Sequence, residues 1–211
     1  MVISYYGLEC FKVQFGELTI AFNPPAKEAA HKSPKFGADI VFVSLPHQDF
    51  NGVGQVAFGE KVPFAIEGPG EYELKGITGQ GFPIATKYDG DNRIGAVYKV
   101  TLESMMLAFL GPLPNASALS AHAKSALEGA DILFVPIGGG EVLDPSAAHK
   151  LAVSLEPRLI VPMHYEEKGK ELTQFLKECG QSSASVEKLT LKKKDVEKKK
   201  GEVVCLSFGA K

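Results

Sequence analysis

The stretch ADIVFVSLPHQDFNG, residues 38–52, joins a predicted buried strand to a short loop that carries two side chains capable of chemistry. We expect the strand over Asp39–Ser44, because its residues are mainly apolar, β-branched or aromatic. The loop that follows places His47 and Asp49 two residues apart. An imidazole and a carboxylate in such a loop are groups that bind a divalent cation or transfer protons. The stretch therefore predicts a metal site, a part of one, or what remains of one.

The composition is that of an ordinary globular protein. Hydrophobic residues make up 45% of the 211 residues, and charged residues make up 23%. A chain of this length buries roughly 70% of the surface that the unfolded chain exposes, so a substantial core is available. The net charge of −2 provides no broad basic surface. We therefore expect no nucleic-acid partner.

The sequence carries no recognisable targeting or membrane signal. The N-terminal residues lack a basic segment followed by an apolar one, so no signal peptide is predicted. The longest nearly uncharged apolar run, residues 104–114, is about half the ~20 residues that a membrane-spanning helix needs. Cys10, Cys179 and Cys205 are odd in number and lie far apart, which argues against disulfides and against a thiolate zinc site. We expect a cytoplasmic protein with no membrane contact.

The first hundred residues have the pattern of short strands separated by turns. Aromatic and β-branched residues are frequent, and glycine or proline bounds most of the runs. The predicted strands are Val2–Tyr6, Cys10–Phe15, Leu18–Phe22, Asp39–Ser44, Pro63–Ile66, Tyr72–Ile77, Gln80–Ala85 and Gly95–Leu102. This half of the chain is therefore expected to be a β-meander in character.

From Met105 onward, buried strands are predicted to alternate with helices. The strands are Met105–Leu110, Asp131–Pro136 and Leu159–Pro162. One helix is capped by Asn115, a second starts at Asp144 and Pro145 and runs to about Glu156, and a third spans Glu167–Cys179. This alternation favours strands buried beneath helices. Since the two halves are too interleaved to separate, we predict a single domain over residues 1–211.

The segment KLTLKKKDVEKKKGE, residues 188–202, contains seven lysines. We predict two strands here, Val186–Leu191 and Glu202–Phe208, joined as a solvated hairpin whose lysines discourage edge-to-edge aggregation. An electrostatic tether to an acidic partner is the alternative interpretation.

Several motifs along the chain resemble, in order, those of the metallo-β-lactamase superfamily, and most closely its small bacterial branch of predicted zinc-dependent hydrolases. They are SYYG (4–7), TIAFNPP (19–25), ADIVFVSLPHQDFNG (38–52), GPGEYELKGI (68–77), LAFLGPL (107–113), ADILFVPIGGG (130–140) and PRLIVPMHY (157–165). The resemblance implies an α/β (α+β) fold. The expected architecture is a four-layer αβ/βα sandwich: two mixed β-sheets face to face, flanked by helices on both outer faces, with a metal site at one edge of the sheets.

The same resemblance implies a metal-binding loop of the form H-x-H-x-D-H, of which this chain retains half. The two imidazoles and the carboxylate of such a loop surround adjacent cations that activate a shared water. Here the first histidine of the loop falls on Leu45, the second on His47, the aspartate on Asp49 and the last histidine on Phe50.

The later ligand motifs are altered as well. The H-L-G-D motif of the family falls on residues 109–112, so that its histidine is Phe109 and its bridging aspartate is Pro112. Asn23 stands where the family usually has aspartate, and the C-terminal histidine is retained as His164.

Four of these replacements are apolar, and the resemblance places Leu45, Phe50, Phe109 and Pro112 in one region. Carboxylates buried without their cation cost several kcal/mol per unpaired charge, so hydrocarbon is the better filling for a site that binds no metal. We therefore expect a hydrolase-like protein without the dinuclear zinc centre and with no cofactor. Such a pseudoenzyme would bind a small molecule or a protein.

Three alternatives remain open for the polar residues of the loop. His47, Asp49 and His164 are the candidate metal ligands, and together they offer two histidines and one carboxylate to a single zinc or another divalent metal in a hydrolase. His47 and Asp49 are also a candidate pair for metal-free acid–base chemistry. The plainest interpretation is that Asp49 holds the loop by hydrogen bonds to nearby backbone N–H groups or to His164.

Overall fold

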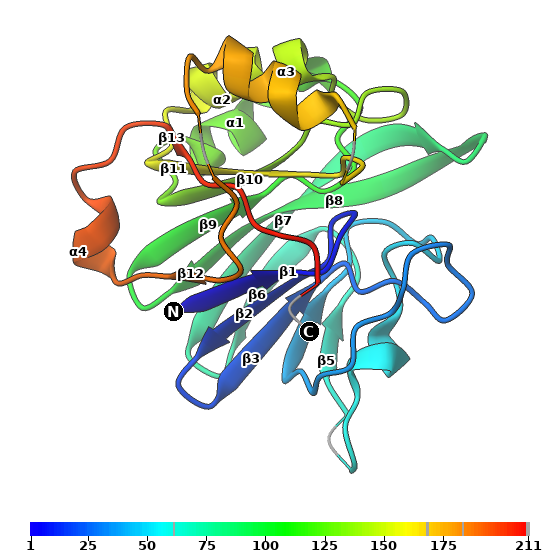
Figure 1. Ribbon diagram of the computed structural model, residues 1–211. Helices are drawn as coiled ribbons and strands as arrows, with labels where there is room; N and C mark the ends of the chain where they lie inside the picture. Colours follow the sequence, from blue (N-terminus) through cyan, green and yellow to red (C-terminus); the bar gives the residue numbers. More distant parts are fainter. Residues whose placement is uncertain (61, 168, 183, 210–211) are drawn as a thin grey trace.

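Two β-sheets form the centre of the molecule, seen in the computed structural model that describes residues 1–60, 62–167, 169–182 and 184–209 (Figure 1). The first sheet has six strands in the order β12-β1-β2-β3-β4-β5. Their bounds are β12 (Leu189–Thr190), β1 (Val2–Tyr5), β2 (Phe11–Phe15), β3 (Leu18–Phe22), β4 (Ile40–Phe42) and β5 (Phe64–Ile66). Strands β1, β2 and β3 are antiparallel neighbours, whereas β3, β4 and β5 run parallel. The predicted meander is therefore interrupted by β4 and β5.

The second sheet has seven strands in the order β13-β11-β10-β9-β8-β7-β6. They are β13 (Glu202–Val203), β11 (Leu159–Met163), β10 (Ile132–Pro136), β9 (Met105–Phe109), β8 (Asp91–Leu102), β7 (Ile77–Tyr88) and β6 (Gly70–Leu74). The predicted meander resumes in this sheet, where β6, β7 and β8 are again antiparallel neighbours. Strands β9, β10, β11 and β13 are parallel, and every residue of β10 and β11 is buried. Continuous apolar runs of this kind are typical of parallel strands covered on both faces.

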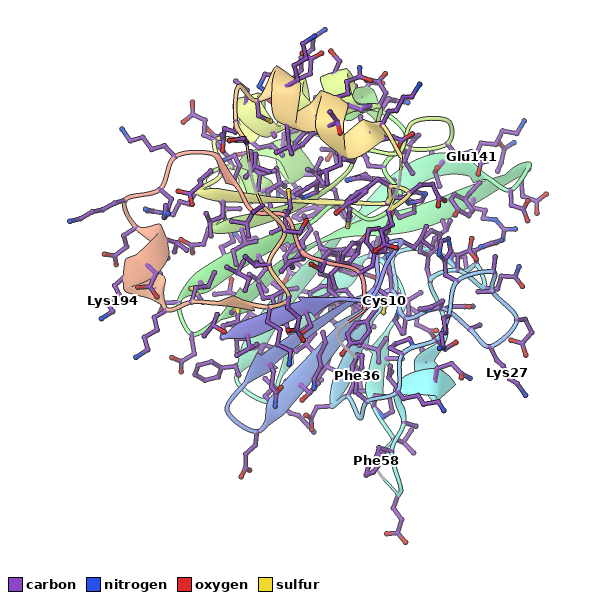
Figure 2. All side chains as sticks on the ribbon, in the orientation of Figure 1. Cys10, Lys27, Phe36, Phe58, Glu141 and Lys194 are labelled. Carbon is purple, nitrogen blue, oxygen red and sulfur yellow. The ribbon has the colours of Figure 1, made fainter. Side chains whose placement is uncertain are left out.

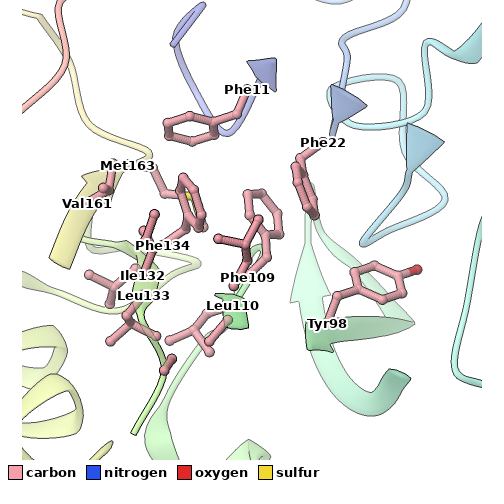
Figure 3. Close-up of a cluster of buried hydrophobic side chains, with 14 of the residues drawn as sticks. Phe11, Phe22, Tyr98, Phe109, Leu110, Ile132, Leu133, Phe134, Val161 and Met163 are labelled. Atoms are coloured by element: carbon pink, nitrogen blue, oxygen red, sulfur yellow. The ribbon is translucent and has the colours of Figure 1, made fainter. Parts of the chain in front are cut away.

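Aromatic side chains fill the space between the two sheets (Figure 3). The ring of Phe22 stacks on the ring of Phe109 with 4.6 Å between centroids, and Phe11 meets Phe134 edge-on at 4.8 Å. All four side chains are fully buried. Large rings in these arrangements contribute about 0.5–1.5 kcal/mol per pair beyond the area they bury. The core that positions the site is therefore aromatic.

Few helices flank the sandwich, and they lie mainly on one side. The helices α1 (Ala121–Leu127), α2 (Pro145–Leu155) and α3 (Glu171–Glu178) gather over the second sheet (Figure 1). The first sheet is covered instead by the 3₁₀-helix η1 (Val53–Val56), whose Val56 is buried with Ala21, Val41 and Val43. The predicted sandwich of two mixed sheets flanked by helices is confirmed.

The helix boundaries follow local capping chemistry. The Asp144 carboxylate accepts the N–H of Ala147 at 2.8 Å, as predicted for the start of α2. The helix predicted after Asn115 is divided: Asn115 caps a short 3₁₀-helix, η2 (Ala116–Ala118), and Ser120 caps α1. Serine and asparagine side chains satisfy the free N–H groups of a first turn, so two caps in sequence produce two helices.

Two other boundaries differ from prediction. The strand predicted over Tyr72–Ile77 is interrupted at Lys75 and Gly76, whose φ angles of 50° and 78° turn the chain from β6 into β7. The helix predicted from Glu167 begins at Glu171, and Lys168 lies outside the described residues. Gly180 ends this helix region with φ +62°, as expected for a glycine after a helix.

The predicted hairpin over residues 188–202 is wrong. Strand β12 pairs with β1 in the first sheet, whereas β13 pairs with β11 in the second. Between them lies the short helix α4 (Lys193–Val196), which is held by the buried Val196. Lysine spacing alone does not reveal that each flanking strand completes a different sheet edge.

None of the described helices is long and apolar enough to cross a membrane.

Candidate functional site

Four segments that are distant in sequence meet at one end of the sandwich. They are the turn between β1 and β2, the loop after β4, the β7–β8 hairpin and the residue that follows β11. The hairpin turns at Asp89 and Gly90, both with positive φ, which is the geometry of the tightest strand connections. These turns bring Glu9, His47, Asp49, Tyr88 and His164 into one neighbourhood.

The most buried polar contact of this neighbourhood joins Glu9 to His164. Glu9 is fully buried, and its Oε1 lies 2.7 Å from His164 Nδ1. Its Oε2 accepts a hydrogen bond of 2.8 Å from Asn23 Nδ2. The Asn23 Oδ1 in turn accepts the backbone N–H of Ser44 at 2.7 Å. Both carboxylate oxygens of Glu9 are therefore satisfied in the protein interior, as a buried carboxylate requires.

Burial and hydrogen bonding shift the pKa of Glu9 in opposite directions. Desolvation raises the pKa of the Glu9 carboxyl, while the His164 imidazole and the Asn23 amide lower it, and the net direction is upward. Asp49 adds a smaller upward contribution to the same pKa, which places its charge close to Glu9.

The backbone fixes the His164 ring as firmly as the carboxylate does. His164 has φ +56°, and its N–H donates to the carbonyl of Leu8 at 2.5 Å. A Cβ atom on Gly138 would lie 2.2 Å from the carbonyl oxygen of His164, so only glycine fits beside it. A left-handed conformation in a non-glycine residue is costly and persists only where the surroundings enforce it. The structure therefore holds the imidazole in one place.

His47 and Asp49 interact with each other and with the β7–β8 hairpin. The Asp49 N–H donates to His47 Nδ1 at 3.2 Å, and His47 Nε2 lies 3.4 Å from Asp89 Oδ2. The Tyr88 hydroxyl donates to Asp49 Oδ2 at 3.0 Å. Asp49 was expected to accept from backbone N–H groups or from His164, but its carboxylate accepts instead from a tyrosine that the sequence did not single out.

Burial raises the pKa of the Tyr88 hydroxyl well above its usual value, and the negative charges of Asp49, Glu9 and Glu141 act in the same direction. Figure 2 shows Glu141 beside the tip of the β7–β8 hairpin. Tyr88 is therefore a permanent hydrogen-bond donor in a region of negative potential.

Aromatic rings occupy the space among the candidate ligands. The Phe50 ring lies 6.2 Å from the His47 ring and 6.3 Å from the His164 ring, while Tyr88 lies 5.0 Å from Phe50 and 5.0 Å from His47. Leu8, Leu45, Phe50 and Tyr88 form one buried group, which we term the apolar site cluster. Its members are at most 7% exposed.

The apolar replacements do not all lie in this cluster. Leu45 and Phe50 do, as expected. Phe109 instead stacks on Phe22 in the core between the sheets, so its predicted convergence with the other two is wrong. Phe109 is the last residue of β9, and its side chain faces the opposite sheet rather than the loops. Pro112 is also buried.

The structure brings His47 and Asp49 together but pairs His164 with Glu9, which the sequence analysis missed. Among the described residues, no three histidine, cysteine, aspartate or glutamate side chains are grouped so as to hold a metal ion. The role of His47, Asp49 and His164 as metal ligands stays a prediction. A carboxylate inside the apolar run YYGLECF was the available signal for Glu9, because a charged residue between buried ones needs a partner.

A pocket of about 270 Å³ opens beside His164. Its walls include Leu8, Tyr88, Gly138, His164, Glu166 and Glu171. The His164 side chain is 17% exposed, so part of its ring is accessible from this pocket while Nδ1 faces the buried Glu9.

The fold and these loops define a member of the β-lactamase superfamily. The sequence matches the family described as the β-lactamase superfamily domain over residues 2–164, and the chain belongs to that family.

Solved structures of other proteins share the fold over 90% or more of this chain. A proposed zinc-dependent hydrolase of the metallo-β-lactamase superfamily from Thermotoga maritima is 25% identical, with a TM-score of 0.75 and 99% of each chain covered. A proposed metal-dependent hydrolase from Parabacteroides distasonis is 16% identical, with a TM-score of 0.68, over 98% of this chain and 93% of the other. The metallo hydrolase Igni18 from the archaeon Ignicoccus hospitalis is 19% identical, with a TM-score of 0.66, over 90% of this chain and 99% of the other.

Proposed function

We propose that this chain is a β-lactamase-superfamily protein that binds a small molecule without the pair of cations used by metal-dependent relatives. In this proposal, the apolar site cluster and the Glu9–His164 pair take the place of the dinuclear centre. The observation that carries it is the position of Phe50, whose buried ring lies 6.2 Å from the ring of His47 and 6.3 Å from the ring of His164.

The residues present do not fit a pair of cations. A dinuclear site needs several His or carboxylate ligands around two ions about 3.5–4 Å apart. Here Leu45 and Phe50 stand at two of the loop positions that the family resemblance assigns to ligands, and both are at most 1% exposed. Asp49 Oδ2 is engaged by Tyr88 at 3.0 Å, and His164 Nδ1 by Glu9 at 2.7 Å. Filling this volume with hydrocarbon avoids the cost of uncompensated buried charge.

A single-metal hydrolase using His47, Asp49 and His164 is the second candidate function. One observation favours it: histidines that bind metal commonly present their other ring nitrogen to a carboxylate, as His164 does to Glu9. Against it stands the packing of the Phe50 and Tyr88 rings against both histidines, with centroid distances of 5.0–6.3 Å.

Elemental analysis of protein purified without a histidine tag from zinc-supplemented cells separates the two candidates. Our proposal expects far less than one metal ion per chain, with no difference between the wild type and His164→Ala. A stoichiometric metal that disappears in His164→Ala would establish the single-metal site and overturn the proposal. A His149→Ala variant serves as the matched control, because His149 lies in α2 and lines a different pocket from His164.

A further inference from the structure

The pocket beside His164 is lined by hydrogen-bond acceptors that indicate the kind of small molecule it binds. This inference rests on the proposed function and makes it more specific. The imidazole is fixed by Glu9 at Nδ1 and by the Leu8 carbonyl at its backbone N–H. When a carboxylate accepts from Nδ1–H, the neutral ring keeps its lone pair on Nε2. Among the described residues, no hydrogen bond to Nε2 of His164 is found. In that tautomer, the ring offers an unpaired acceptor to the pocket.

A second unpaired acceptor lies in the same wall. Glu171 lines the pocket, and its Oε2 is buried with no hydrogen-bond partner among the described residues. A buried carboxylate oxygen without a donor is costly, and native structures rarely leave one in that state. A ligand in the pocket that supplies N–H donors would meet the Glu171 carboxylate and Nε2 of His164 in the same wall.

The remaining lining favours a positive charge. The ionisable side chains around the pocket are His31, His164, Glu166 and Glu171, with no lysine or arginine in the described part of the wall. Aromatic rings of Tyr88 and Tyr165 complete it. Carboxylates together with ring faces attract organic cations, whereas they repel anions. The neighbouring Asp49 and Glu141 add to the negative potential at Tyr88.

We propose that this pocket binds a small organic ammonium ion, a protonated primary amine, through Nε2 of His164 and the carboxylate of Glu171. A primary ammonium group has three N–H donors and one positive charge, so it matches two acceptors in an acidic wall. The volume of about 270 Å³ limits the ligand to a compact molecule, since sites for drug-sized ligands are about 300–1,000 Å³.

Three two-carbon probes of similar size test the charge preference: ethylamine hydrochloride, ethanol and sodium acetate. Each is titrated into isotope-labelled protein at pH 7.5 while the ring signals of His164, assigned by their loss in His164→Ala, are followed by NMR. We expect a saturable shift with ethylamine alone. Equal saturation with ethanol or acetate, or no saturation with ethylamine, would overturn the proposal.

Two variants on the same helix test the contact. In Glu171→Gln we expect the Kd for ethylamine to rise about tenfold or more, the loss typical of a hydrogen bond to a charged group. Glu178→Gln, an exposed position of α3 outside the pocket wall, is the matched control and should leave the Kd unchanged. Equal Kd values in Glu171→Gln and wild type would contradict the assigned contact. Thermal unfolding of both variants confirms that each is folded.

Zinc chloride alone, titrated into the same sample, separates this inference from the proposed function. Stoichiometric zinc binding to protein that does not bind ethylamine would overturn both, and stoichiometric zinc binding that displaces bound ethylamine would overturn the proposed function alone. Metal-free protein that binds neither zinc nor ethylamine would leave the proposed function standing and defeat the amine site alone.

Discussion

Glu9 Oε1 lies 2.7 Å from Nδ1 of His164, and the two residues are separated by 155 positions along the chain. This contact joins the first turn of the protein to the end of β11. It fixes an imidazole that the family resemblance assigns to a metal site, and it does so with a carboxylate that the resemblance did not assign.

Glu9→Gln is expected to change the pH dependence of stability. The folded pKa of Glu9 is raised, chiefly by burial, so the folded state holds its proton to higher pH than the unfolded chain does. The contribution of Glu9 to the free energy of unfolding is therefore largest below the ordinary pKa of glutamate. This contribution is lost as the pH rises through the pKa of Glu9 in the folded state, and the loss is about 1.4 kcal/mol for each unit by which that pKa is raised. Gln does not titrate. As the pH rises, the free energy of unfolding measured in urea should therefore fall more for the wild type than for Glu9→Gln. The same pH dependence of this free energy in the two proteins would contradict the prediction.

Asn23→Asp tests why an amide stands at this position. The Asn23 Nδ2 donates to Glu9 at 2.8 Å, and a carboxylate there would place two acceptors in contact without a shared proton. Like charges at this distance cannot both ionise at low cost. We expect a destabilisation of about 1–3 kcal/mol at neutral pH that diminishes under acid conditions, measured by urea unfolding. A loss of stability that is the same at all pH values would point to a purely steric cause.

Phe50→Ala should leave a cavity in the apolar site cluster. The side chain is fully buried and contacts the Tyr88 ring at 5.0 Å. Truncation of a buried phenylalanine costs about 3–5 kcal/mol, which thermal or urea unfolding measures directly. Phe64→Ala is the control, because Phe64 is 55% exposed and should lose little. A cost at position 50 no larger than the cost at position 64 would contradict a packing role.

Leu45→His/Phe50→His reverses the apolar replacement in the loop. Together with His47 and Asp49, the variant would carry all four ligand positions of the H-x-H-x-D-H pattern. Two imidazoles in a buried apolar cluster should destabilise the metal-free protein by about 1–3 kcal/mol for each group left without a hydrogen bond. Zinc that binds only the folded state should restore stability, by about 2.7 kcal/mol at a hundred times its Kd. The readout is the Tm with and without zinc, and an equal shift in the wild type would defeat the prediction.

The sequence predicted the sheets far better than the site. Continuous apolar runs such as Ile132–Pro136 predicted buried strands. Asp144 followed by Pro145 predicted the start of the helix α2. Contacts of long sequence separation were out of reach. Nothing beside Glu9 indicates that its partner is His164, and nothing in the loop indicates that Tyr88 would donate to Asp49. Phe109 shows a different limit, because a motif position gives the residue but not the direction of its side chain.

The chain between residues 186 and 206 supplies one outer strand to each sheet, β12 to the first and β13 to the second. During synthesis, therefore, β1 and β11 have unpaired backbone edges until this late segment emerges from the ribosome. Lys193 of that segment also contacts the buried Asp131 at 2.6 Å, so it adds a second cation to the carboxylate that Arg158 contacts at 3.1 Å. Lys194 beside it points to solvent from α4 (Figure 2). A nascent chain stalled before residue 186 is thus exposed to pairing with other chains, and completion of this segment closes both sheets at once.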